Sequence, residues 1–231
     1  MATAQNRLIE LLPRKDRARL LAQCESVPLV LSDVLYEPGQ VTRQVYFPVD
    51  GFISLITRVE HHPGLEVGMV GREGMLGAQL ALGVTTSPLH ALVQGSGSAW
   101  RIGSAPFRRE LDASPALRGH LYRYMHVLMC QLTTSASCLR FHQIGQRLAR
   151  WLLMSQDRAH ADQFLVTQEF LAYMLGVRRV GITQAASRLQ RAGLIQYHRG
   201  EMQVLDRSGL EAAACSCYAS DRQTYAELLA S

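Results

Sequence analysis

Arginine and amide side chains gather in one stretch of the chain in a pattern suited to binding a nucleic acid. Between Arg140 and Arg207 there are ten arginines and five acidic residues, an excess equal to the formal net charge of +5 of the whole protein. A guanidinium group can bond O6 and N7 of guanine together or clamp a phosphate, and a glutamine amide can pair with adenine in the same way. A bias of the coding DNA toward arginine would raise the total, but it would not concentrate the excess in one segment.

The spacing of apolar residues predicts the element that presents these groups. Ile182, Ala185, Ala186 and Leu189 follow the i, i+3, i+4, i+7 rule of a helix face that points inward. A shorter helix after Thr167 ends at Gly176, so two helices meet across a glycine turn, which is the arrangement that places the second helix in a DNA major groove.

The residues left on the outer face or flanking it are the predicted DNA contacts. Val180 and the methyl group of Thr183 can contact a thymine methyl. Arg178 at a helix start, Thr167 at an N-cap and Arg199 at a turn tip are in positions that typically contact phosphates. The full set is Thr167, Arg178, Arg179, Val180, Thr183, Gln184, Ser187, Arg188 and Arg199. The alternative for the same pattern is a solvated basic helix that docks on a protein.

The segments around these two helices are predicted as follows. A helix covers 142–154 and a polar loop 157–163, and a two-stranded wing (194–197 and 202–205) carries Arg199 at its tip. Ser208 and Glu211 form a capping box that opens one terminal helix through Leu229.

A long amphipathic helix precedes this region. Ser114 and Pro115 are a good start signal, and a helix of about 25 residues would be roughly 40 Å long. It is too long to be covered by a small domain, so its apolar seam predicts a contact with a second copy of the chain, with packing inside one chain as the alternative. The seam residues are Leu117, Leu121, Tyr124, Leu128 and Leu132.

The N-terminal part has a different sequence pattern. Two short helices are predicted within 6–25, and from residue 29 to 102 short β-rich runs alternate with turn signals, which is typical of an antiparallel barrel or roll. A β-hairpin is predicted from residues 52–59 and 65–70, with His61-His62 at its tip. Residues 91–94 and 98–102 read as a second pair of strands around a turn at Gly95-Ser-Gly-Ser98.

From Ala4 to Leu229 the chain resembles the Crp/Fnr superfamily of bacterial transcription regulators. The motifs that carry the resemblance are Tyr36-Glu-Pro-Gly39, Val45-Tyr-Phe-Pro48 and the segments 71–77, 146–153, 165–179 and 189–195. The resemblance implies an α+β fold with a cyclic-nucleotide-binding-like β-roll (1–113), a dimerisation helix (114–140) and a winged helix-turn-helix domain (141–231). It further implies a homodimer on palindromic double-stranded promoter DNA, RNA polymerase as a partner if the protein is an activator, and base reading by Arg179, Val180 and Gln184.

The sensor motif departs from the nucleotide-binding members of this family. Gly77-Ala78 stands where they carry Gly-Glu for the ribose hydroxyl, and Leu89-His90-Ala91 stands where they carry Arg-Ser/Thr-Ala for the cyclic phosphate. Because burying an unpaired phosphate would cost several kcal/mol, we expect no useful cyclic AMP binding. A regulator gated by another signal in the roll, such as cyclic di-GMP, haem or redox chemistry, is the open alternative.

Composition and motifs exclude other classes of protein. No apolar run approaches the roughly 20 residues of a membrane span, and the N-terminus lacks a signal core, so a cytoplasmic protein without a membrane partner is expected. No motif of a P-loop, a metalloprotease or a serine hydrolase is present, which predicts a protein that is not an enzyme and needs no cofactor. The five cysteines predict structural thiols and no metal site, with Cys215-Ser-Cys217 as a weak hint of metal or redox chemistry.

Overall fold

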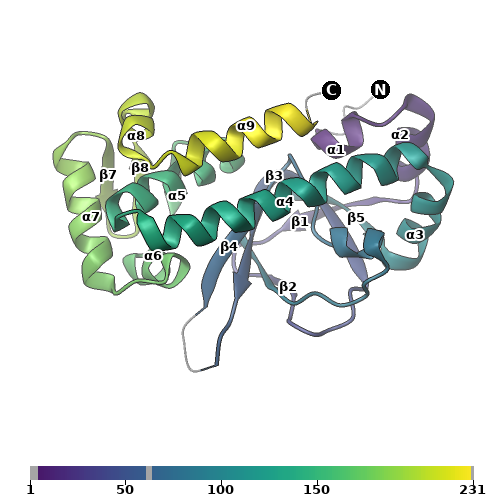
Figure 1. Cartoon of the computed structure of the whole chain (residues 1–231), viewed down its shortest axis with the longest axis horizontal. Coiled ribbons are helices and arrows are strands. Elements are labelled where there is room, and N and C mark those ends of the chain that lie inside the picture. Colours follow the sequence, from purple (N-terminus) through teal and green to yellow (C-terminus); the bar gives the residue numbers. More distant parts are fainter. Residues whose placement is uncertain (1–4, 61–63, 230–231) are drawn as a thin grey trace.

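The computed structural model of the chain describes residues 5–60 and 64–229 (Figure 1). The predicted hairpin tip at His61-His62 lies outside these residues. The protein is a mixed α and β structure with an antiparallel sheet at one end, a helical unit at the other and one long helix that runs across both, as the sequence predicted.

The N-terminal part is an antiparallel roll. Its strands follow the order β1-β5-β3-β4, with β2 also paired to β5. Apolar residues of these strands form the core of the roll, and Phe47, Ile53 and Val93 are fully buried. The elements are α1 (Arg7–Glu10), α2 (Arg14–Leu21), β1 (Glu25–Leu29), β2 (Val34–Tyr36), β3 (Gln44–Thr57), β4 (Leu65–Val70), the 3-10 helix η1 (Ala78–Leu82) and β5 (His90–Gly103).

Two predictions for the roll meet different outcomes. The hairpin is confirmed, because β3 and β4 pair from Ile53 opposite Val70 to Thr57 opposite Leu65. The turn predicted at Gly95–Ser98 is wrong, because β5 is a single strand through these residues and pairs with both β1 and β3. The glycines there serve a close approach of two backbones, since a Cβ on Gly97 would lie 2.3 Å from the carbonyl oxygen of Asp50.

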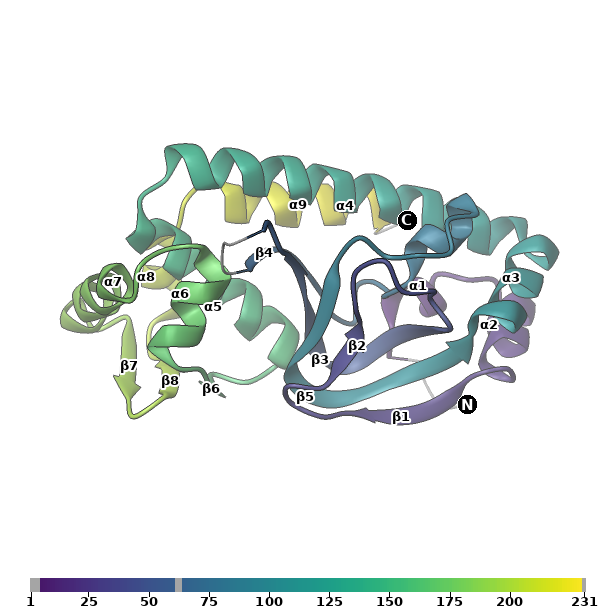
Figure 2. The ribbon, with the colours of Figure 1, turned by 90° about the horizontal axis from the view of Figure 1, so that it is seen from below.

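The long helix is α4 (Pro115–Phe141), preceded by α3 (Ser104–Ala113), which the sequence analysis did not predict. The Ser114 hydroxyl accepts a hydrogen bond from the Leu117 amide at 3.1 Å, which confirms the predicted start. The C-terminal helix α9 (Cys217–Leu229) runs beside α4 in the opposite direction, back toward the roll (Figures 1 and 2). Leu229 therefore lies in the same apolar core as Leu121 and Phe107.

The C-terminal unit packs around one central helix. Leu148 and Leu152 are fully buried in its core together with Ile182 and Leu171. Besides α9, its elements are α5 (Ile144–Ala159), β6 (Gln163–Leu165), α6 (Gln168–Leu175), α7 (Arg179–Arg191), β7 (Ile195–His198), β8 (Glu201–Val204) and α8 (Arg207–Ala213).

Three details of this unit differ from the prediction. The wing sheet has three strands in the order β6-β8-β7, because Gln163–Leu165, which begins at the last residue of the expected loop, pairs with β8. Helix α5 continues to Ala159. The terminal segment is two helices, separated after Ala213, and its N-cap is Asp206, which accepts the Gly209 amide at 2.9 Å. Among the described residues no helix is long and apolar enough to cross a bilayer.

Candidate nucleic-acid interface

Helices α6 and α7 form the predicted pair across a glycine turn. The Thr167 hydroxyl caps α6 by accepting the Phe170 amide at 3.1 Å, and Gly176 ends it at φ +60°, a conformation that glycine adopts without strain. The inward face of α7 is confirmed, because Ile182, Ala185, Ala186 and Leu189 are all buried against the unit's core.

The other face of α7 is open to solvent at the end of the molecule far from the roll (Figures 1 and 2). The predicted contact residues on and before it are all exposed, namely Arg178, Arg179, Val180, Thr183, Gln184, Ser187 and Arg188. Among the described residues none of these three arginines makes an ion pair, so their charges are available to a ligand. The hydroxyl of Thr183 donates to Gln168 Oε1 at 2.6 Å, which leaves mainly its methyl group to face outward.

The wing is held against the two helices by polar contacts. The Tyr197 hydroxyl donates to the Val166 carbonyl at 2.8 Å, and the Tyr197 amide donates to Gln190 Oε1 at 2.9 Å. Arg199, exposed and at φ +48°, lies at the turn between β7 and β8. The exposed residues of α7, the N-terminus of α6 and the wing tip therefore lie close together.

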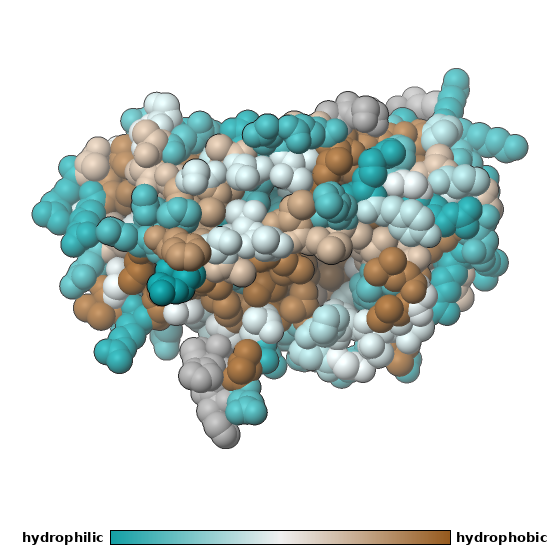
Figure 3. Space-filling model, viewed as in Figure 1, coloured by the Kyte–Doolittle hydropathy of each residue, from teal (hydrophilic) through white to brown (hydrophobic). Residues whose placement is uncertain are grey.

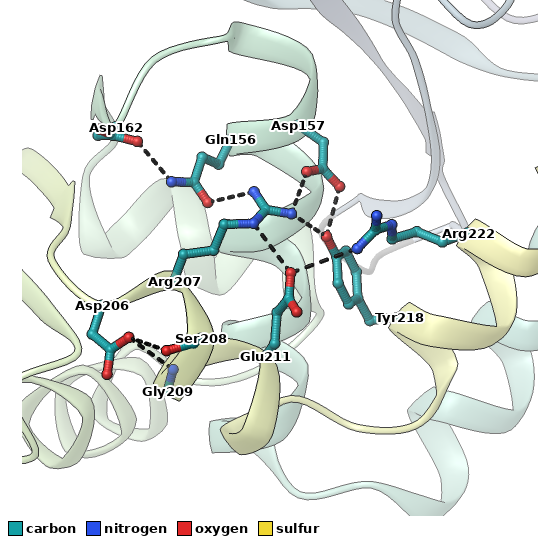
Figure 4. A network of polar contacts seen from close by, with 10 residues as sticks. All are labelled: Gln156, Asp157, Asp162, Asp206, Arg207, Ser208, Gly209, Glu211, Tyr218 and Arg222. Carbon is teal, nitrogen blue, oxygen red and sulfur yellow. Dashed lines mark hydrogen bonds and ion pairs between the residues drawn. The ribbon is translucent and has the colours of Figure 1, made fainter.

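A polar network fixes α8 and α9 to α5 behind this surface (Figure 4). The Arg207 guanidinium bonds Asp157 at 2.7 Å and Gln156 at 2.8 Å, and the Tyr218 hydroxyl donates to the other oxygen of Asp157 at 2.8 Å. Sequence reasoning did not find these residues, because about 50 positions separate Arg207 from its partners on α5 and no local pattern links them.

Comparison with known proteins supports this description. Residues 146–213 match the family model of the Crp-like helix-turn-helix domain. The chain is similar in structure to a Crp/Fnr-family transcriptional regulator from Eubacterium rectale, with a TM-score of 0.68, 14% identity and coverage of 87% of this chain and 94% of that one. It is also similar to a Crp/Fnr-family regulator from Thermus thermophilus, with a TM-score of 0.67, 22% identity and coverage of 82% and 98%. No curated protein matches it significantly in sequence.

The chain has the Crp/Fnr fold and carries a Crp-like helix-turn-helix domain. This outcome confirms the resemblance and the fold class inferred from the sequence. Both of these solved structures are of transcriptional regulators.

The seam predicted on α4 of this Crp/Fnr fold needs correction. Leu117, Leu121 and Tyr124 are buried in the chain's own core, and the Tyr124 hydroxyl donates to the Met75 carbonyl at 3.2 Å. Leu128 is half-buried against the same core, while Leu132 is 44% exposed. The roll and α9 cover this side of α4, so the first three residues cannot meet a second copy.

A different apolar stripe remains exposed on α4. Tyr122 and Met129 lie seven residues apart, as do Leu132 and Leu139, and Leu132 follows Met129 by three residues, which is a heptad pattern. Their exposed fractions lie between 36% and 65%. Half-exposed Met125 and small Ala136 complete the repeat. Apolar surface is visible across the middle of the face on which α4 lies (Figure 3).

The degenerate nucleotide motif lies in a filled part of the roll. Gly77, Ala78 and Ala91 are buried, Leu89 is half-buried, and buried His90 bonds Glu37 at 3.0 Å between Nδ1 and Oε2. Leu89 and Ala91 pack into a core that contains Tyr36, Leu76 and Val93. A cavity of about 620 Å³ opens beside the motif, lined by residues between 35 and 46, which include Glu37, and by none of the five motif residues.

Buried polar contacts between α5 and the roll help to join the roll to the C-terminal unit. The Trp151 indole donates to Glu66 Oε1 at 3.0 Å, and Arg158 Nε lies 2.8 Å from Glu73 Oε1. Burial raises the pKa of Glu66 to about 7, although the hydrogen bond from Ser54 opposes the shift. For Arg158, burial disfavours the charge, but the Glu73 carboxylate, together with Tyr225 and Asp157, outweighs this effect and raises the pKa above its usual value.

Proposed function

We propose that this protein is a sequence-specific DNA-binding transcriptional regulator that binds a palindromic promoter site as a homodimer. The observation that carries the proposal is the outer face of α7, where arginines that make no ion pair within the described part of the chain are exposed together with an amide and a small apolar side chain. Those groups match the donors and methyl contacts by which proteins read base edges in the major groove. As an activator it would also contact RNA polymerase.

The roles of individual residues follow from their places on this surface. Arg179, Val180 and Gln184, on the first half of α7, are proposed to read bases. Thr167 and Arg178 lie at helix N-termini and Arg199 at the wing tip, and we assign them to phosphates. Ser187 and Arg188 continue the outer face toward the flanking backbone.

Selection from random duplex DNA, followed by a salt titration, tests this function. We expect a palindromic consensus and a log affinity that falls linearly with log salt, by about 0.9 for each phosphate neutralised. A flat salt response with no enriched sequence would show instead that the basic helix docks on a protein.

We assign the dimer contact to the exposed heptad stripe Tyr122, Met125, Met129, Leu132, Ala136 and Leu139. Replacing Met129 with aspartate should dissociate the homodimer, because two buried carboxylates would face each other across the seam. Sedimentation velocity measures the result, with Arg123→Asp, exposed on the same helix but off the stripe, as the control. If Met129→Asp stays dimeric, this stripe is not the interface.

We also propose that cyclic AMP is not the signal. The motif has no arginine to neutralise the phosphate, and Leu89 and Ala91 pack into the roll's own core. Isothermal titration calorimetry with cyclic AMP should give no heat of binding. Micromolar affinity, together with a shift in DNA binding, would contradict the prediction, and the same titration with cyclic di-GMP examines the alternative ligand.

A further inference from the structure

Three cysteines and one histidine, far apart in sequence, converge beside the junction of α4 and α5. Cys138 lies in the last turn of α4, His142 is the residue that caps its C-terminus, and Cys215 and Cys217 lie at the break between α8 and α9. The four possible ligand atoms all lie within 4.8 Å of one another. All three cysteines are buried, and together they form a cluster of their own.

The local structure explains why these four side chains meet. Cys138 and His142 are four residues apart at a helix end, so both project to the same side. The break in the C-terminal segment places Cys215 just before α9 and Cys217 at its first residue. Because α9 packs along α4, these two thiols face the end of that helix.

We propose that Cys138, His142, Cys215 and Cys217 bind one zinc ion in a tetrahedral site. Bonds of about 2.3 Å to sulfur and about 2.0–2.1 Å to nitrogen place the ligand atoms of such a site roughly 3.5–3.8 Å apart. The Sγ atoms of Cys138 and Cys215 are 3.5 Å apart, and Cys217 Sγ lies 3.5 Å from His142 Nδ1. Three thiolates and one imidazole are a common ligand set of structural zinc, and thiolates select soft or borderline ions.

The spacing argues against an iron–sulfur cluster at the same residues. A cluster spreads its four protein ligands over two or more iron atoms, so it needs some of them further apart than a single ion does. Four ligand atoms confined within 4.8 Å suit one metal ion at their centre.

The surroundings suit the charge of the loaded site. Three thiolates around Zn²⁺ leave one net negative charge, and the buried, positively charged guanidinium of Arg150 lines the same pocket as Cys138. Arg150 Nη2 bonds Asp221 at 2.6 Å, but its Nε is buried with no hydrogen-bond partner among the described residues. That free N–H can donate to a metal-bound thiolate, as partners around structural metals commonly do.

The bound ion would tie three segments together. It links the end of α4, the connection into α5 and the start of α9. Without the ion, only polar contacts and side-chain packing hold these three segments together. The proposal does not depend on DNA binding, because it uses the four ligands alone.

Metal analysis of the full chain, purified without chelator and with any affinity tag removed, tests the site. We expect about one zinc per chain by plasma mass spectrometry, and at least a tenfold lower content in Cys215→Ser. Cys130→Ser, which removes a thiol of α4 outside the cluster, should keep its zinc. Equal zinc in the two variants would overturn the assignment.

Two measurements on the unaltered chain keep the test independent of how the variants fold. Cobalt exchanged into the site should give thiolate-to-cobalt charge-transfer bands and the intense visible bands of tetrahedral coordination. A strong chelator should lower the melting temperature, and added zinc should restore it. Zinc-free protein that is indifferent to the chelator, a Cys138–Cys215 disulfide in the purified chain, or an iron–sulfur spectrum would each refute the proposal.

Discussion

Replacing Arg158 with methionine should lower the free energy of unfolding by about 3–5 kcal/mol, because it leaves the Glu73 carboxylate buried without its partner. The two side chains are only 8% and 13% exposed, and their atoms are 2.8 Å apart. A urea titration followed by circular dichroism measures the loss. The pair joins α5 to the roll, so its loss should also loosen the two units from each other.

The matched control is Arg101→Met. Arg101 pairs with Glu25 at the same 2.8 Å, but the two side chains are 34% and 62% exposed, and exposed pairs contribute at most about 1 kcal/mol. The double variant Arg158→Met with Glu73→Gln should be more stable than the Arg158 variant alone, because no charge is left unpaired. Equal losses in the Arg158 and Arg101 variants would show that burial does not set the importance of the ion pair.

The helix-turn-helix could be predicted from the sequence because its information is local. The i, i+3, i+4, i+7 spacing from Ile182 to Leu189 assigns each residue of α7 to one face, and the structure buries those four and exposes all the others except half-buried Gly181. Caps and turns are local as well, so Thr167, Gly176 and Ser114 were placed correctly.

Features that depend on contacts between distant segments could not be predicted from local sequence patterns. Helix α4 carries two apolar stripes, and periodicity cannot tell which of them the roll and α9 cover; the leucine-rich stripe through Leu121 turned out to face inward. Glycines such as Gly97 signal a turn in sequence, yet they lie within a strand where two backbones approach closely. The cysteine cluster needed Cys138 and Cys215, 77 residues apart, to be brought together by α9.

Replacing Arg179 with alanine should weaken binding to the selected DNA by about 1–3 kcal/mol, roughly 5- to 150-fold. Arg179 is exposed at the first position of α7 and makes no ion pair among the described residues, so a base edge is the partner that this change would remove. Because one guanidinium reads one base pair, selection with the variant should lose its preference at one position of each half-site.

Two further variants separate base reading from general electrostatic attraction. Arg199→Ala, at the wing tip, should weaken binding to all sequences alike and lower the slope of log affinity against log salt by about 1. Arg108→Ala removes an equally exposed arginine from α3, on the roll, and should leave both affinity and consensus unchanged. If the Arg179 variant returns the original consensus with only a smaller salt slope, Arg179 contacts phosphate, and base recognition rests on Gln184 and Val180.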